Sequence, residues 1–255
     1  MELRVLGCHG GETLTHRTSS FLVEGRLAID GGAVTSMLSL EEQMELETVV
    51  VSHAHLDHIR DLATLADNRC QKGAKPLTIA GTKETLNALR AHFFNDVVWP
   101  DFSKILMPDG PTLVFKELEL ETTVSLSGLS VTAVAVSHTI DTAGFVVESG
   151  NAAIAYSGDT GPTERFWSVL GEKKNLRALL MEVSFPNAHH RVAQLSAHHT
   201  PETLEKELGK LRNDPHLPVM LYHIKPVFQD EVERELLRIQ HRTLHICQLG
   251  EQYLI

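Results

Sequence analysis

Histidine is frequent in this sequence, and several histidines fall where a chain can bind metal. There are 15 histidines among 255 residues. One segment reads His-Ala-His-Leu-Asp-His, and its candidate ligands are His53, His55, Asp57 and His58. The segment follows the apolar run Thr48–Ser52 and precedes a helical pattern, so we expect a strand-to-helix turn. Side chains two residues apart on an extended backbone point to one side, so the first two ligands face together. The last two begin the helix and face differently.

Three more apolar runs end on a residue of the same kind. Val131–Ser137 precedes His138, Ala152–Gly158 precedes Asp159, and Pro218–Tyr222 precedes His223. Ligands gather at the carboxyl ends of buried strands, because the strands fix the backbone while the following loops shape a cleft. Imidazole and carboxylate ligands suit zinc, manganese or iron. Four such endings predict a metal centre that can hold two adjacent ions, with the two oxygens of Asp159 between them.

The elements that must position these residues fall into two similar halves. In the first half we expect strands at Glu2–Leu6, Ser19–Glu24, Arg26–Asp30, Thr48–Ser52 and Pro76–Ala80, and helices near Asp57–Asp67 and at Lys83–Phe93. In the second half we expect short strands within Leu113–Leu126, then strands at Ser130–Ser137, Gly144–Glu148, Ala152–Ser157, Ala178–Val183, Pro218–Tyr222 and Leu244–Gln248, and helices near Thr163–Leu170, Pro201–Arg212 and Gln229–Arg238. Two strand-rich halves that each end in helices predict two packed sheets with helices outside.

Composition excludes some classes of protein. The formal net charge of −10, from 23 Lys+Arg and 33 Asp+Glu, argues against a nucleic-acid partner, because such proteins usually carry a basic stripe. The apolar runs are far shorter than the ~20 residues of a membrane-spanning helix, so we expect no membrane association. Three scattered cysteines, Cys8, Cys70 and Cys247, form no disulfide framework. Without a secretory signal at residues 1–11, we expect a cytoplasmic protein, whose oligomeric state stays open, a homodimer included.

The motif with its three later ligands resembles the signature of the metallo-β-lactamase superfamily, in which a His-x-His-x-Asp-His turn precedes a His, a bridging Asp and a last His. Six segments are similar to the class II 3′,5′-cyclic-nucleotide phosphodiesterases: Leu6–Gly11, Thr18–Val23, Ser52–His58, Ser157–Pro162, Glu182–Asn187 and Tyr222–Pro226. The resemblance implies an α/β fold, a four-layered αβ/βα sandwich of two mixed sheets, over a single hydrolase domain at residues 1–255. It also implies two divalent metal ions, with zinc preferred and manganese or iron as alternatives.

The resemblance further implies a division of labour among the ligands. His53, His55 and His138 bind one metal, Asp57, His58 and His223 bind the other, and Asp159 is shared. Coordination lowers the pKa of water from ~16 toward ~7, so this centre would supply a hydroxide at neutral pH. The implied reaction is hydrolysis of a small nucleotide, cyclic AMP or cyclic GMP, to the 5′ monophosphate, with Asp57 orienting or deprotonating the nucleophile.

A general acid for the departing 3′ oxygen is expected in one late segment. Where the family has Gly-His-Leu-Thr-Pro, this chain has Ala-His-His-Thr-Pro. We align His198 with the family histidine, and His199 leaves the assignment open by one position. Thr200 is a good N-cap and Pro201 suits the first helical position, so His198 precedes a helix N-terminus, which favours phosphate oxygens. Glu182 is expected to steady the acid.

Some roles and functions stay open in the sequence. Lys225 is either a phosphate contact or a solvated surface charge, and either Asp30 or Asp61 supports a metal-bound imidazole. The rival functions on this scaffold are a tRNA 3′-end endonuclease and a thioester or lactone hydrolase, and a rival of another class is a non-catalytic, metal-dependent module that binds cyclic nucleotides. The chain lacks the Gly/Lys/Arg-rich insertion expected of a tRNA-binding arm. Two full ligand sets are unnecessary for nucleotide capture alone.

Overall fold

Two seven-stranded sheets form the centre of the computed structural model, which describes residues 1–211, 216–240 and 242–255. The first sheet has the order β16 (Gln252–Leu254), β1 (Glu2–Gly7), β2 (Ser20–Val23), β3 (Leu27–Ile29), β4 (Thr48–Val50), β5 (Leu77–Gly81) and β8 (Leu113–Glu117). The second has the order β15 (Leu244–Ile246), β14 (Val219–Tyr222), β13 (Leu176–Glu182), β12 (Ala152–Tyr156), β11 (Ala143–Ser149), β10 (Leu129–Ala135) and β9 (Thr123–Leu126). A separate hairpin pairs β6 (Leu106–Met107) with β7 (Gly110–Pro111).

Strand directions repeat between the two sheets. Strands β1, β2 and β3 are antiparallel neighbours, whereas β3, β4, β5 and β8 run parallel. Likewise β9 to β12 are antiparallel and β12 to β15 are parallel. Parallel neighbours need long crossover connections, which helices usually supply. Each half therefore begins with hairpins and ends with helical crossovers, as the sequence predicts.

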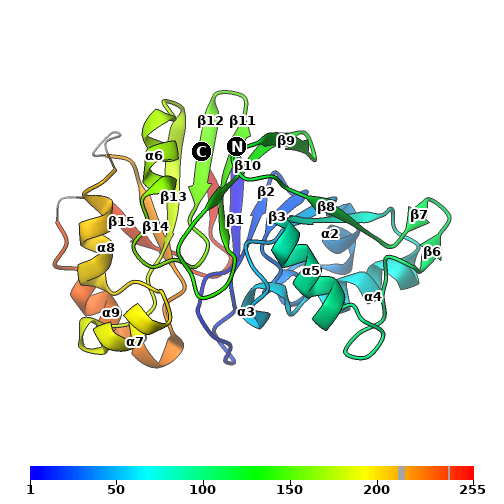
Figure 1. Ribbon diagram of the computed structural model, residues 1–255, viewed down its shortest axis with the longest axis horizontal. Helices are drawn as coiled ribbons and strands as arrows, with labels where there is room; N and C mark the ends of the chain where they lie inside the picture. The colour runs from blue at the N-terminus through cyan, green and yellow to red at the C-terminus, as the bar shows by residue number, and fades with distance from the viewer. Residues whose placement is uncertain (212–215, 241) are drawn as a thin grey trace.

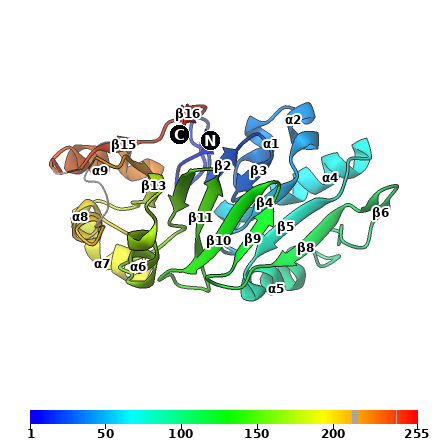
Figure 2. The ribbon, with the colours of Figure 1, turned by 90° about the horizontal axis from the view of Figure 1, so that it is seen from above.

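Helices cover the outer face of each sheet. Beside the first sheet lie α1 (Val34–Met37), α2 (Leu40–Glu45), α3 (Leu56–Ile59), α4 (Leu62–Lys72) and α5 (Lys83–His92). Beside the second lie α6 (Arg165–Glu172), α7 (His190–Leu195), α8 (Pro201–Leu208) and α9 (Gln229–Leu236), with 3₁₀ turns η1 (Asn187–His189) and η2 (Pro226–Phe228). Figures 1 and 2 show these two helical groups on opposite sides of the strands.

Three apolar clusters fill the spaces between the layers. The middle cluster joins the two sheets, with Phe21 of β2 packed on Tyr156 of β12. A second cluster lies between the second sheet and its helices around Trp167, and a third lies between the first sheet and its helices around Leu65. This confirms the predicted four-layered αβ/βα sandwich. The two ends of the chain meet, because the Met1 amino group donates to the Ile255 carbonyl at 2.7 Å (Figure 1).

Most predicted elements are present, and the differences have local causes. The single helix expected near Asp57–Asp67 is two helices, α3 and α4, because the backbone of Gly31 forms hydrogen bonds with the residues at the break between them. Its N–H donates to the His58 carbonyl at 2.7 Å, and its carbonyl accepts from the Asp61 N–H at 3.0 Å. The helix expected over Pro201–Arg212 ends at Leu208 in α8, and Arg212 lies outside the described residues. Over the described ranges, no helix has the length and apolar character needed to cross a membrane.

Candidate metal centre and active site

Four strand ends converge at one end of the two sheets. His53 follows β4 of the first sheet, whereas His138, Asp159 and His223 follow β10, β12 and β14 of the second. The first ligand group consists of His53, His55 and His138. The second ligand group consists of Asp57, His58, Asp159 and His223. Within each group the candidate ligand atoms lie within 4.8 Å of one another. The structure thus brings together all seven residues that the sequence proposes as ligands.

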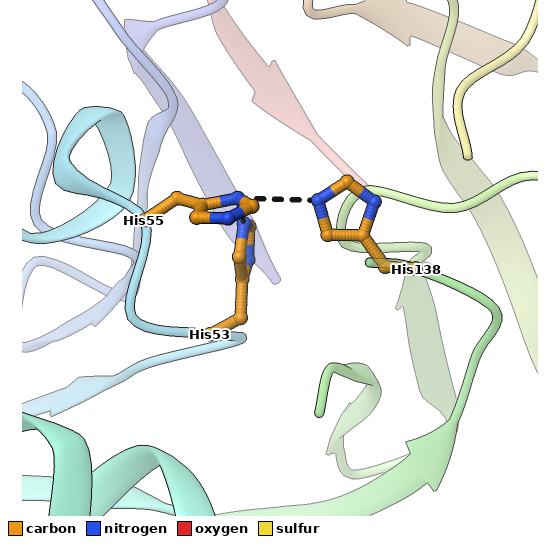
Figure 3. Close-up of side chains that lie close together, drawn as sticks. All are labelled: His53, His55 and His138. Atoms are coloured by element: carbon orange, nitrogen blue, oxygen red, sulfur yellow. Dashed lines mark hydrogen bonds between the residues drawn. The ribbon is translucent and has the colours of Figure 1, made fainter. Parts of the chain in front are cut away.

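The first ligand group presents three imidazoles to one point. Figure 3 shows His55, from the segment after β4, turned toward His138 from the loop after β10, with the His53 ring pointing at the His55 ring. Nδ1 of His55 lies 2.9 Å from Nε2 of His53 and 3.2 Å from Nε2 of His138. On the far side of their rings, Nδ1 of His53 lies 3.0 Å from Ser52 Oγ and Nδ1 of His138 lies 3.1 Å from the Ala197 carbonyl. These outer partners orient the two rings so that both Nε2 atoms face His55.

The second ligand group surrounds one carboxylate oxygen. Oδ2 of the buried Asp159 lies 3.2 Å from His58 Nε2 and 3.1 Å from His223 Nε2. The same oxygen is 3.8 Å from Nε2 of His53, so Asp159 reaches toward the first ligand group as well. Asp57 lies 3.3 Å from His223, and its side chain stays 28% exposed. The second ligand group is therefore buried at Asp159 and accessible to solvent at Asp57.

A buried carboxylate, Asp30, stands behind the first sheet's ligands. Its Oδ2 accepts from His58 Nδ1 at 2.7 Å, from Ser52 Oγ at 2.8 Å and from the Tyr156 hydroxyl at 2.6 Å. Because Ser52 donates to Asp30, its oxygen is left to accept the N–H of His53. Asp61 instead accepts from backbone N–H groups of helix α1. Asp30 is thus the residue that supports imidazoles, a choice the sequence leaves open.

Glu182 has the corresponding place behind the second sheet's residues. Ser184 Oγ donates to Glu182 at 2.9 Å, and its oxygen lies 2.8 Å from Nδ1 of His223. Nδ1 of His198 lies 3.2 Å from the other Glu182 oxygen, which also accepts the His199 backbone N–H at 3.1 Å. Burial raises the pKa of Glu182 to about 6. Glu182 therefore positions one ligand through a serine and contacts His198 directly.

His198 and His199 occupy different surroundings. The His198 ring stacks on His223, with centroids 5.1 Å apart, and lies 5.0 Å from the His138 ring. The His199 side chain points to Thr203, whose Oγ1 is 3.2 Å from its Nδ1, and its Nε2 has no partner among the described residues. His198, two residues before Thr200, the N-cap of α8, is the one whose ring contacts both ligand groups.

The electrostatics of the centre suit a divalent cation. Burial lowers the pKa of His53 and of His138, which keeps both imidazoles in the neutral form that binds metal. Burial raises the pKa of Asp57, but the hydrogen bond from His223 and the nearby imidazole charges outweigh burial and hold it below its ordinary value. Among the described residues, two buried atoms have no hydrogen bond: Asp159 Oδ1, and His58 Nε2, which lies 3.2 Å from Asp159 Oδ2 without hydrogen-bond geometry. Such buried atoms are unfavourable unless something binds them, so the donor set fits metal ions.

Backbone strain is concentrated here. Asp30, Ala197 and His223 have φ values of 58°, 51° and 71°, in a region that non-glycine residues seldom adopt. Each lies beside a ligand or is one, so the surrounding structure holds strained backbone where it sets ligand direction. Glycine is needed at position 32 for a steric reason, because a Cβ there would lie 2.3 Å from the Asp57 carbonyl oxygen. The turn that carries the metal-binding motif therefore packs too closely against residue 32 for that residue to have a side chain.

Sequence reasoning missed the supporting hydroxyls. Ser52 and Ser184 lie in segments that resemble the family and Tyr156 directly precedes one, yet none carries a signal of its role before the fold is known. A weak signal exists in the serine directly before His53 and in the serine two residues after Glu182. Serine is common before strand ends, so that spacing alone does not distinguish a support from a loop residue.

The sandwich with its ligand residues at one sheet edge defines the metallo-β-lactamase fold class of hydrolases. Residues 33–223 match the family model described as the beta-lactamase superfamily domain. That match covers most of the chain, and the protein belongs to this superfamily. With the fit of the donor set to metal, this family supports a metal-dependent hydrolase.

Individual relatives narrow the comparison. The chain is 31% identical over 213 residues to a probable 3′,5′-cyclic-nucleotide phosphodiesterase of Yersinia pestis, a match that covers 73% of this chain and 59% of that protein. The chain therefore spans less than two thirds of this relative's length. The crystal structure of unliganded yeast PDE1 superimposes with a TM-score of 0.84 at 20% identity, covering 100% of this chain and 99% of that one. Human tRNase Z, short form, superimposes with a TM-score of 0.73 at 17% identity, covering 100% and 99%. Both structural likenesses concern the fold.

Proposed function

We propose that this protein hydrolyses 3′,5′-cyclic nucleotides, cyclic AMP or cyclic GMP, to 5′-nucleoside monophosphates. The substrate class is taken from the Yersinia relative's name, and the chemistry is supported by the site. The observation that carries the proposal is the position of His198. Its ring touches His138 of the first ligand group and His223 of the second, and its Nδ1 is paired with buried Glu182. These contacts support His198 as the proton donor beside the metal centre.

Two divalent ions, zinc for preference, fit this proposal. His53, His55 and His138 would hold one ion, Asp57, His58 and His223 the other, and Asp159 would be shared. When bound, such ions neutralise phosphoryl charge and activate water at neutral pH. The protein's own net charge of −10 otherwise repels an anionic ester.

The remaining steps belong to side chains. Asp57, at the open side of the second ligand group, accepts a hydrogen bond from the attacking water and orients it. Glu182 holds Nδ1 of His198, which leaves Nε2 to deliver a proton to the ribose 3′ oxygen as it leaves. An alkoxide leaves poorly without that proton. The products are one 3′ hydroxyl and one 5′ phosphate on the same nucleotide.

Product analysis tests the proposal. Purified protein, reconstituted with zinc or with manganese, is incubated with cyclic AMP, cyclic GMP, a precursor tRNA and a thioester. We expect the cyclic nucleotides to be opened and chromatography to show the 5′ rather than the 3′ monophosphate. His53→Ala should be inactive, whereas His245→Ala, at an exposed histidine paired with Glu251, should match the wild type.

Two results would contradict the proposal. Intact cyclic nucleotides together with cleaved precursor tRNA would assign the site to the endonuclease reaction instead. Tight binding of cyclic AMP without turnover, in protein with full metal content, would make this chain a binding module.

A further inference from the structure

Lys225 lies two residues after the candidate ligand His223, and the two side chains lie close together. Its backbone N–H donates to the Ser184 carbonyl at 3.2 Å, beside the serine that supports His223. A Cβ placed on Gly10 would lie 2.9 Å from Lys225 Cδ and 3.0 Å from His223 Nδ1. The aliphatic stem of Lys225 and the His223 imidazole therefore lie against the same glycine. The absence of a side chain at Gly10 leaves room for both.

The charge of Lys225 lacks a partner of its own. Four lysines of the chain are half-buried, and three of them have an acceptor: Lys116 donates to the Ser125 carbonyl, Lys173 to Glu148, and Lys210 to Glu164. For Lys225, no hydrogen bond or ion pair of the ammonium group is formed with any residue in the described ranges. A half-buried lysine without a protein acceptor leaves a positive charge unbalanced beside His223. A ligand of opposite charge would meet this need.

The field of Lys225 reaches the candidate acid. Burial is the main cause that lowers the pKa of His198 and of His223, and the positive charge of Lys225 lowers both further. The stem of Lys225 lies against the same glycine as His223, whose ring stacks on His198, so both rings are within reach of this lysine.

We propose that Lys225 contacts a phosphoryl oxygen of the substrate and so restricts the site to anionic esters. This rests on the proposed function, because it places a phosphodiester at the centre. Lysine binds phosphate as a point charge rather than in a fixed fork, so arginine is a partial substitute. The structure thereby favours the phosphate-contact role over the solvated surface charge, the two alternatives that the sequence leaves open.

Binding of inorganic phosphate tests the contact without relying on turnover. Calorimetric titration of zinc-reconstituted protein with phosphate should give a Kd that is about 10- to 100-fold weaker in Lys225→Ala, the usual effect of losing a hydrogen bond to a charged group. The KM for cyclic AMP should rise by a similar factor while kcat changes much less. Lys225→Arg should retain most of the affinity. The matched control is Lys206→Ala, at an exposed lysine paired with Glu202, and it should behave as wild type.

Metal content and melting temperature are measured for every variant, and Lys225→Gln, which keeps most of the stem without the charge, is titrated as well. Wild-type phosphate affinity and KM in both uncharged variants would overturn the proposal, even if cyclic nucleotides are hydrolysed. If wild-type protein leaves cyclic nucleotides intact but both uncharged variants bind phosphate more weakly, the proposed function fails and the contact stands.

Discussion

Two buried carboxylates, Asp30 behind the first sheet and Glu182 behind the second, support the metal centre by the same device. Each accepts a hydrogen bond from a serine hydroxyl whose oxygen faces the imidazole of a candidate ligand, Ser52 for His53 and Ser184 for His223. Each carboxylate is fully buried. Similar folding of the two halves has therefore produced similar supports at the two sheet edges.

The difference lies in what else each carboxylate holds. Asp30 also binds His58, a second candidate ligand, and the Tyr156 hydroxyl from the opposite sheet, so all of its contacts serve to position groups. Glu182 also contacts His198, which belongs to neither ligand group. The comparison teaches that one support only positions candidate ligands, whereas the other also contacts the proposed proton donor, His198. Variants at the two supports should therefore fail in different ways.

Removing Asp159, which reaches toward both ligand groups, should have the largest effect. In Asp159→Ala the central oxygen of the second ligand group is lost, and so is the 3.8 Å approach to His53. We expect bound metal, measured by elemental analysis, to fall from about two ions per chain and activity to fall to background together. Full activity with two bound ions would show that neither side of the centre needs this carboxylate.

His198→Ala should separate proton donation from metal binding. Both ligand groups are complete without His198, although it also lies within ligand distance of His138 and Asp159, so the variant should keep its metal and a near-normal melting temperature while kcat for cyclic AMP falls about 10²- to 10⁴-fold. The activity of the variant on a p-nitrophenyl phosphodiester, whose leaving group needs no proton, should fall much less. His199→Ala is the matched control, because that side chain points to Thr203.

Three results would change this assignment. If His199→Ala is nearly inactive while His198→Ala is active, the general acid is His199 rather than His198. Loss of metal in both variants would make neither histidine the donor. Equal losses on both substrates would show that His198 acts in positioning rather than in proton transfer.

The candidate ligand residues could be predicted from the sequence because they depend on local pattern, whereas the supports depend on pairing between distant segments. Strand ends are visible as apolar runs, and each run that stops before His53, His138, Asp159 or His223 is a local signal. The choice of Asp30 over Asp61 depends on β3 lying beside β4, which brings Asp30 to Ser52. Strand β16 was missed for the same reason, since its three residues are fixed by β1 at the other end of the chain.

Asp30→Asn tests the purely positional support. The amide keeps the size of the carboxylate but removes the charge that fixes the His58 proton, so metal affinity should fall about 10- to 100-fold. The measurement is competition with a chromophoric chelator. Activity at saturating zinc should recover, unlike that of His198→Ala. Asp61→Asn is the control, and unchanged affinity in both asparagine variants would contradict the role of Asp30.

The smallest effect is expected at the hydroxyl that joins the two sheets. Tyr156 and Tyr222 are both buried and stack with centroids 5.0 Å apart, but the Tyr156 hydroxyl donates to Asp30 whereas the Tyr222 hydroxyl donates to the Gly158 carbonyl. Replacing either residue by phenylalanine keeps the ring and removes the contacts of its hydroxyl, one for Tyr156 and two for Tyr222, which also lies 3.1 Å from Ser157 Oγ, so each variant should lose on the order of 1 kcal/mol of unfolding free energy. Only Tyr156→Phe also takes a donor from Asp30, so only this variant should bind zinc more weakly, by about threefold, well below the change expected for Asp30→Asn. Denaturant unfolding of metal-free protein and chelator competition separate the two effects. Equal zinc affinity in the two phenylalanine variants, with equal losses of stability, would show that Tyr156 only joins the sheets and that Asp30 orients His58 without it.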